Sequence, residues 1–169
     1  CSDCHTTGSG NLPTVQISGP STLGTGETGD FTLSITRHGS QTDQTHAGFN
    51  IAATAGALAA ASSDMTASTS LNGSTSTNNL VELAHTSRHA YDTGSVTVSF
   101  RWTAPNSVGG QTLYAAGNSV NNASGNGGDD AASTSHSVDV VCPDADEDGE
   151  TAESCGGDDC DDSDKDINT

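Results

Sequence analysis

The chain has 169 residues, of which only 31% are hydrophobic and 4% aromatic, and its formal net charge is −18. An acidic field of this size excludes nucleic acid and anionic membrane surfaces as partners, because both repel it. Cations are favoured instead, above all at the C-terminal end: residues 142–169 carry 12 acidic side chains against one lysine, whereas residues 1–141 carry 10 against three arginines.

The first five residues, Cys1-Ser2-Asp3-Cys4-His5, have the C-x-x-C-H spacing of a c-type haem attachment sequence. In such a sequence the thiols of Cys1 and Cys4 bond to the haem vinyl groups, and the imidazole of His5 is placed to ligate the iron. The sequence therefore predicts haem c as a covalent cofactor, attached to a short segment, residues 1–13.

The cysteine usage and the start of the chain both indicate export. Few lysines and clustered cysteines are typical of an oxidising compartment. Because the chain starts at a haem cysteine, we expect a mature form whose export signal has been removed. No transmembrane run is present, so we expect an extracellular or bacterial cell-surface location without membrane insertion.

Residues 14–141 contain short runs in which apolar and polar side chains alternate, as in half-buried β-strands. These runs predict strands at residues 14–18, 31–35, 47–53, 80–83, 96–102, 112–116 and 137–141, with a long polar loop or an edge excursion at 62–79. Seven short strands without a helical period predict an all-β fold, an immunoglobulin-like β-sandwich. The expected core is Val15, Ile17, Phe31, Leu33, Ile35, Phe49, Ile51, Leu83, Val96, Val98, Phe100, Trp102, Leu113, Tyr114, Val138 and Val140.

Four runs in the sandwich carry a family resemblance. They are Ala47-Gly48-Phe49-Asn50, Glu82-Leu83-Ala84-His85-Thr86, Phe100-Arg101-Trp102-Thr103-Ala104-Pro105, and Leu113-Tyr114-Ala115-Ala116-Gly117-Asn118-Ser119-Val120-Asn121. In this order, behind C-x-x-C-H, they make residues 1–141 resemble the bacterial Reeler-like domains of the choice-of-anchor V family. The resemblance implies an exported, surface-associated sandwich with a covalent haem, and it implies architecture more than mechanism.

A second axial ligand for the iron has to come from elsewhere in the chain. The candidates are His38, His46, His85, His89, His136 and Met65. His85 is the first choice, because it ends a predicted strand and belongs to the His-Thr pair that the resembling family shares; His46 is the second. A third arrangement uses a histidine from a neighbouring subunit, which would place haems at subunit contacts and build a homopolymer by self-association.

The tail, residues 142–169, begins with Asp144, Asp146, Asp148 and then Gly149, a spacing that wraps oxygen ligands around a hard cation. It opens like an EF-hand loop, but the twelfth position is Cys155 instead of glutamate, and no flanking helices are predicted. The carboxylates are so dense that they repel one another strongly without a counter-ion. The sequence therefore predicts Ca²⁺ as a second cofactor.

The run from Cys155 to Asp164 resembles the Asp-rich calcium repeats of thrombospondin type 3. The resemblance implies that Asp144, Asp146 and Asp148 start one ion site, which Asp159, Asp161, Asp162, Asp164 and Asp166 complete, or beside which they form a second. Cys155 and Cys160 are close enough in sequence to pair. Cys142 is then left over, and we expect it to pair with a residue beyond the visible end or with another chain.

With two histidine ligands the iron has no open position, which favours electron transfer over catalysis. The leading hypothesis is an extracellular monohaem c-type cytochrome, as the repeating subunit of a filament or surface assembly. The alternative is a calcium-stabilised cell-surface adhesion or binding module in which haem is structural. A third hypothesis is a haem enzyme with an open distal face. However, no Ser-His-Asp order, nucleotide loop or HExxH helix is evident in the sequence, so we expect that the protein is not an enzyme.

Overall fold

The computed structural model describes residues 11–68, 70–71, 74–75, 81–121, 128–144, 146–153, 157–159, 161, 163–164 and 166–167. This part of the chain is all-β and forms the β-sandwich that the sequence predicts. None of the described residues belongs to an apolar helix long enough to cross a membrane.

The described residues form thirteen strands. They are β1 (Thr14–Ser18), β2 (Thr22–Gly24), β3 (Thr28–Thr36), β4 (His46–Ala53), β5 (Ala57–Ala60), β6 (Met65–Ser68), β7 (Ser70–Leu71), β8 (Ser74–Thr75), β9 (Glu82–His85), β10 (His89–Ala90), β11 (Ser95–Thr103), β12 (Gly109–Val120) and β13 (Asp130–Val141).

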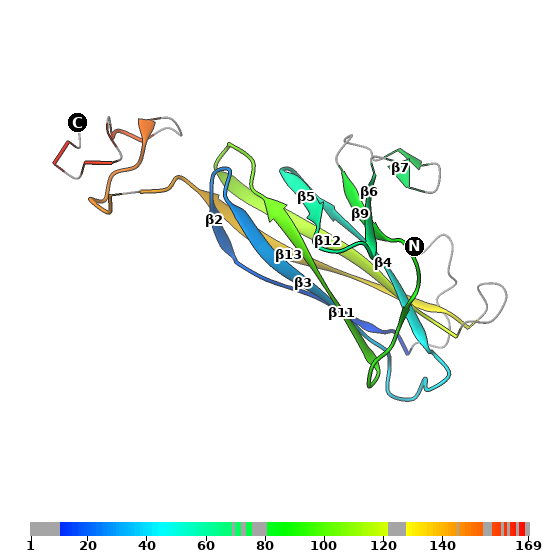
Figure 1. Ribbon diagram of the computed structural model, residues 1–169. Coiled ribbons are helices and arrows are strands. Elements are labelled where there is room, and N and C mark those ends of the chain that lie inside the picture. The colour runs from blue at the N-terminus through cyan, green and yellow to red at the C-terminus, as the bar shows by residue number, and fades with distance from the viewer. Residues whose placement is uncertain are drawn as a thin grey trace.

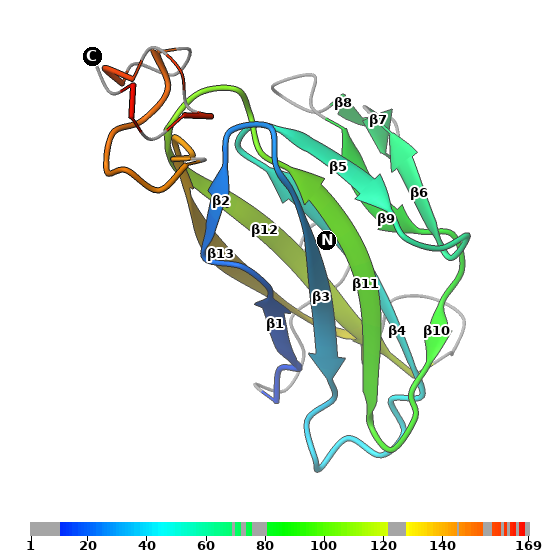
Figure 2. The same cartoon turned by 60° about the vertical axis from the view of Figure 1, so that its left-hand side comes forward.

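Two sheets make the layers of the sandwich (Figures 1 and 2). The smaller sheet has the strand order β1-β3-β11-β5. The larger has seven strands: β2, β13, β12, β4, β9 and β6 follow in this order, and β10 pairs with β4 beyond the end of β9. Pairing is antiparallel except between β2 and β13. Among the described residues, β7 and β8 pair with each other and with no third strand.

The core lies between the two sheets because alternate residues of the long strands point inward. In β11, Val96, Val98, Phe100 and Trp102 are all buried, as their alternation predicts. Phe31 from β3 stacks on Phe100, with ring centroids 5.6 Å apart. Of the sixteen expected core residues, fifteen are buried; the structure adds Leu23, Ala47, Leu58, Met65, Ala104 and Ala115.

Tyr114 was wrongly expected in the core. Its side chain is 49% exposed, because Leu113 and Ala115 on either side of it point inward and leave Tyr114 on the outer face of β12. The run of apolar residues around it made the strand's phase ambiguous. Of the two alternatives for 62–79, the described residues contain an edge strand: β6 pairs with β9 at the end of the larger sheet, and Met65 is buried.

The tail leaves the sandwich where β13 ends, at Val141, and it lies at the β2 end of the molecule (Figure 1, orange to red). It has little regular structure: a parallel bridge joins Ala152 to Asp159. The division into residues 1–13, 14–141 and 142–169 stays a prediction, and most of its first part lies outside the described residues.

Candidate functional site

Three of the four sequence runs that carry the family resemblance meet at one point on the larger sheet. Gly48 is in β4, and Asn118 of β12 is its register partner. His85 ends β9, one residue beyond Ala84, which pairs with Asn50. Residues that are far apart in sequence therefore lie together at the gap between β9 and β10, where neither of these two strands pairs with Gly48 or Phe49 of β4.

The His85 imidazole fills this gap. Its Nδ1 lies 2.8 Å from both the backbone nitrogen and the carbonyl oxygen of Phe49, and its ring centroid is 5.6 Å from that of Phe49. With Nδ1 unprotonated, the Phe49 N–H donates to it; with Nδ1 protonated, it donates to the Phe49 carbonyl. The backbone of Phe49 therefore fixes the ring through Nδ1 in either tautomer, and the second tautomer is the one that leaves the Nε2 lone pair for a metal.

Gly48 is required for this arrangement. A Cβ atom at residue 48 would lie 2.6 Å from Asn118 Oδ1 and 2.7 and 2.9 Å from His85 Cε1 and Nε2. No real Cβ approaches other atoms so closely, so any side chain at this position would displace the imidazole or the amide. The Ala47-Gly48-Phe49-Asn50 run is therefore explained by the space that His85 and Asn118 need.

A second histidine lies next to His85. His89 pairs with Ala47 from β10, and its ring centroid is 5.5 Å from that of Phe49. Its Nε2 is buried and has no hydrogen-bond partner in the described part of the chain. Buried polar atoms without partners are rare. Two imidazoles thus flank the Phe49 ring: the Phe49 backbone holds that of His85, whereas the Nε2 of His89 has no partner among the described residues.

The other candidate axial ligands have different surroundings. His136 Nε2 is 2.9 Å from the Pro20 carbonyl and its ring packs on Phe31, which is a structural role. His38 bonds to Ser40, and His46, on the same outer face as Gly48, bonds to the Thr45 hydroxyl. Met65 is in the core. The haem attachment residues Cys1, Cys4 and His5 lie outside the described residues.

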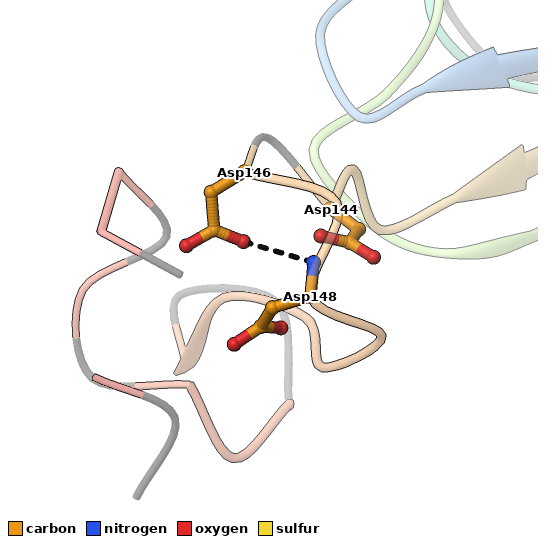
Figure 3. Close-up of side chains that lie close together, drawn as sticks. All are labelled: Asp144, Asp146 and Asp148. Atoms are coloured by element: carbon orange, nitrogen blue, oxygen red, sulfur yellow. Dashed lines mark hydrogen bonds between the residues drawn. The ribbon is translucent and has the colours of Figure 1, made fainter. Parts of the chain in front are cut away.

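The tail brings Asp144, Asp146 and Asp148 together, as Figure 3 shows. One oxygen from each lies within 4.8 Å of the others. Their remaining oxygens hold the loop: the backbone N–H groups of Gly149, Asp148 and Glu150 donate to Asp144, Asp146 and Asp148, respectively, at 3.1, 3.3 and 2.8 Å. Gly149, at φ 100°, supplies the left-handed turn that closes this loop.

Asp159, in the second half of the tail, acts on Asp146 by its charge, but it lies outside the group of three whose oxygens are within 4.8 Å of one another. Its side chain is 2% exposed, and Thr151 and Glu153 hold its backbone by hydrogen bonds. Oδ1 accepts from the Asp161 N–H at 2.9 Å, whereas Oδ2 is buried and without a partner. Asp144 Oδ1, Asp146 Oδ2 and Asp148 Oδ2 are likewise buried without partners in the described part of the chain.

The electrostatics of this cluster are those of an uncompensated group of acids. Burial raises the pKa of Asp146 above 3.8, and the charges of Asp148, Asp159 and Asp144 act in the same direction, while the hydrogen bond from the Asp148 backbone opposes them. Four inward carboxylate oxygens without a hydrogen-bond donor suit a hard cation such as Ca²⁺, which prefers oxygen ligands.

The remaining predicted ligands lie elsewhere in the tail. Asp161 and Asp164 use an oxygen to accept backbone N–H groups in exposed turns, from Ser163 and Asp166 respectively. Asp162, Cys155 and Cys160 are outside the described residues. The expectation that Cys142 is left over within this chain was wrong: it is disulfide-bonded, and its partner cysteine lies outside the described residues.

The sequence contains a signal for some of the residues around His85, but not for all of them. The glycine and asparagine that surround His85 stood in the runs quoted for the family resemblance, but only the fold shows that they touch the same imidazole. His89 was one candidate among six, and nothing in its sequence neighbourhood shows that its Nε2 would be buried.

Comparisons with known proteins identify no family for this chain. No family model matches the chain, and no curated protein matches it. Similar solved structures include a cohesin module from Clostridium perfringens, at 11% identity over 77% of this chain and 97% of that one, with a TM-score of 0.47. The CARDB domain of a Pyrococcus furiosus protein, solved with di-metal ions, is 14% identical over 77% of this chain and 90% of its own, with a TM-score of 0.43.

The Escherichia coli fimbrial subunit AggA is also similar, at 13% identity over 81% of this chain and 97% of its own, with a TM-score of 0.41. These values are too low to transfer a function. The chain's own strands and sheets establish the β-sandwich, and its function has to be argued from its own residues.

Proposed function

We propose that this protein is an exported monohaem c-type cytochrome that carries electrons, with haem attached at Cys1 and Cys4 and its iron held by His5 and His85. This proposal includes the resemblance to the choice-of-anchor V family. The observation that carries it is the His85 imidazole, fixed by the Phe49 backbone through Nδ1 over Gly48. A rigid axial imidazole keeps reorganisation small when the iron changes oxidation state.

The residues around His85 fit a haem ligand better than a structural histidine. A histidine that serves only to hold a strand end does not require a glycine beside it, yet Gly48 leaves room for both the imidazole and the Asn118 amide. The apolar Phe49 ring beside His85 lowers the local dielectric, and burial of this kind tunes an iron potential. When bound, haem supplies the one-electron redox couple; the chain supplies the ligand and its orientation.

The proposed compartment is outside the cytoplasm. The disulfide at Cys142 supports it, because structural disulfides form and persist in oxidising compartments. We also propose that the tail binds Ca²⁺ through Asp144, Asp146, Asp148 and Asp159. The four buried, unpartnered oxygens support this, since only a cation offsets their mutual repulsion.

The test is an absorption spectrum of the protein matured in a bacterial periplasm with the c-type haem attachment machinery. We expect covalent haem, a low-spin reduced spectrum, and no change on adding carbon monoxide. His85→Ala should give a high-spin spectrum that shifts with carbon monoxide, and His38→Ala, at an exposed position, should match the unchanged protein.

Three results would contradict the assignment. Failure to attach haem would remove the cytochrome function and leave the calcium-stabilised binding module. Attached haem with an unchanged spectrum in His85→Ala, and a changed one in His46→Ala, would move the axial ligand to His46. A carbon monoxide shift that appears only on dilution would mean that the ligand comes from a neighbouring copy.

A further inference from the structure

The outer face of the larger sheet carries a groove of about 420 Å³ across β4, β12 and β13. It lies two register positions along from the Gly48–Asn118 pair, where Asn50 pairs with Ala116. Ala116 forms part of the lining, and Tyr114, Asn50, Ser133 and Ser135 stand around it. No histidine lines the groove, so it is distinct from the proposed haem ligand.

Tyr114, one of the two tyrosines of the chain, has an exposed aromatic ring. Its cross-strand partners are Ala52 and Ser135, and its neighbours on the same face are Thr112 and Ala116. All four are small, so no side chain covers the ring, which is 49% exposed. Exposing an aromatic ring costs hydrophobic stabilisation, and nothing in the packing of the sandwich requires it here.

The polar groups of the groove are uncharged and partly pre-positioned. Ser133 and Ser135 present hydroxyls from exposed positions of β13. The Asn50 amide nitrogen donates to Glu82 Oε2 at 2.9 Å, and this bond fixes the side chain with its Oδ1 as a ready acceptor. One flat apolar ring beside several hydroxyl and amide groups is the composition of a small-molecule site of mixed polarity.

We propose that this groove binds a neutral saccharide, with one sugar ring stacked on Tyr114 and its hydroxyls bonded to Asn50, Ser133 and Ser135. A sugar ring has an apolar C–H face and a polar rim, which match the tyrosine ring and the groups around it. Acidic saccharides are excluded, because the lining has no cation and the chain carries a net charge of −18. This inference goes beyond the proposed electron-carrying function.

The test titrates the haem-loaded, calcium-loaded protein with cellohexaose, xylohexaose and mannohexaose, read by calorimetry and by amide NMR shifts. We expect one of the three to bind and to shift residues of the groove. Tyr114→Ala should weaken binding at least 10-fold, whereas Tyr114→Phe, which keeps the ring, should bind within about 3-fold. Val108→Ala, at another exposed apolar position, should bind like the unchanged protein.

The outcome is separable from that of the haem proposal. His85→Ala should change the iron spectrum and leave saccharide binding within about 2-fold, and Tyr114→Ala should do the reverse. The saccharide site is overturned if none of the three probes shifts the groove, or if Tyr114→Ala binds as well as the unchanged protein. It is also overturned if a proline-rich peptide shifts the groove residues and the saccharides do not, because the ring would then be a peptide platform.

Discussion

The sandwich and the tail are stabilised by opposite means. Residues buried between the sheets are almost all apolar, and aromatic rings such as Phe31, Phe100 and Trp102 pack against one another there. The tail residues at 142–167 that the structure describes contribute no apolar side chain to that core. What the tail buries instead is carboxylate, from Asp144, Asp146, Asp148 and Asp159.

This difference separates what each region needs from its surroundings. Apolar burial stabilises the sandwich in water at roughly 25 cal/mol per Å² of buried surface, without any ion. Buried carboxylates destabilise a fold unless they are paired. The sandwich should therefore be indifferent to divalent cations, whereas the closed form of the tail should depend on them. Variants in the sandwich should change its free energy of unfolding, and variants in the tail should change its dependence on calcium.

Phe31→Ala should have the largest effect, and it should act on the sandwich. Phe31 is 1% exposed and contacts Phe100, Trp102 and His136, so its loss leaves a cavity in the centre of the core. We expect a loss of about 3–5 kcal/mol in the free energy of unfolding, measured by urea denaturation. Tyr114→Ala, at an exposed position, should change it by less than about 0.5 kcal/mol. Equal losses in the two variants would mean that the sandwich does not depend on this aromatic packing.

Calcium should act on the tail and spare the sandwich. A ligand at 100 times its Kd stabilises the state that binds it by about 2.7 kcal/mol, which is roughly a 100-fold change in the population of the open form. We expect proteolysis within residues 142–169 to slow by up to that factor on adding calcium, while the urea midpoint of the sandwich stays fixed.

Two aspartate variants sharpen the calcium prediction. Asp159→Asn removes one of the four inward charges and should weaken the calcium effect at least 10-fold. Asp139→Asn, an exposed acid on β13, should leave it unchanged. If sodium chloride at matched ionic strength protects the tail as well as calcium does, the carboxylates are screened and do not form a site.

The sequence predicted the sandwich well because alternation of apolar side chains reports directly which face of a strand is buried. It failed where that signal is absent. Strand β5 has the sequence Ala57-Leu58-Ala59-Ala60, with one large apolar residue, and it is fixed by pairing with β11. The prediction that Tyr114 is buried failed for the opposite reason. Apolar residues lie on both faces of β12, so the sequence does not show which face points into the core.

The site was predicted only as far as local spacing reaches. Asp144, Asp146 and Asp148 are close in sequence, and their loop geometry follows from alternation and Gly149. That the charge of Asp159 acts on Asp146 depends on how the chain returns through the Ala152–Asp159 bridge, which no local pattern encodes. Likewise His85 was the first choice among six candidates, but its bond to the Phe49 backbone is a property of the strand pairing.

Gly48→Ala should have an intermediate effect inside the sandwich. The added Cβ would overlap Asn118 Oδ1 and the His85 ring, so one of them has to move. We expect a loss of about 1–3 kcal/mol and a changed His85 ring signal in NMR spectra. Gly110→Ala is the matched control on β12, because a Cβ there meets no atom within 4 Å. If the loss persists unchanged when His85→Ala is added, the steric conflict does not involve the imidazole.

Tyr91→Phe should give the smallest effect, and it should appear as a change in pH dependence. Burial raises the pKa of Tyr91 above 10.0, against the hydrogen bond to Ser119 at 2.9 Å and the nearby Arg37, which lower it. Because the folded pKa is higher than the unfolded one, this contribution to stability is fully present below pH 10 and is lost as pH rises through the raised value. Tyr91→Phe removes that loss and costs about 0.5–1.5 kcal/mol at pH 7. Urea unfolding between pH 7 and 11 measures the difference from the unchanged protein, with Tyr114→Phe as control. A difference between Tyr91→Phe and the unchanged protein in how calcium protects the tail would contradict the separation of the two regions.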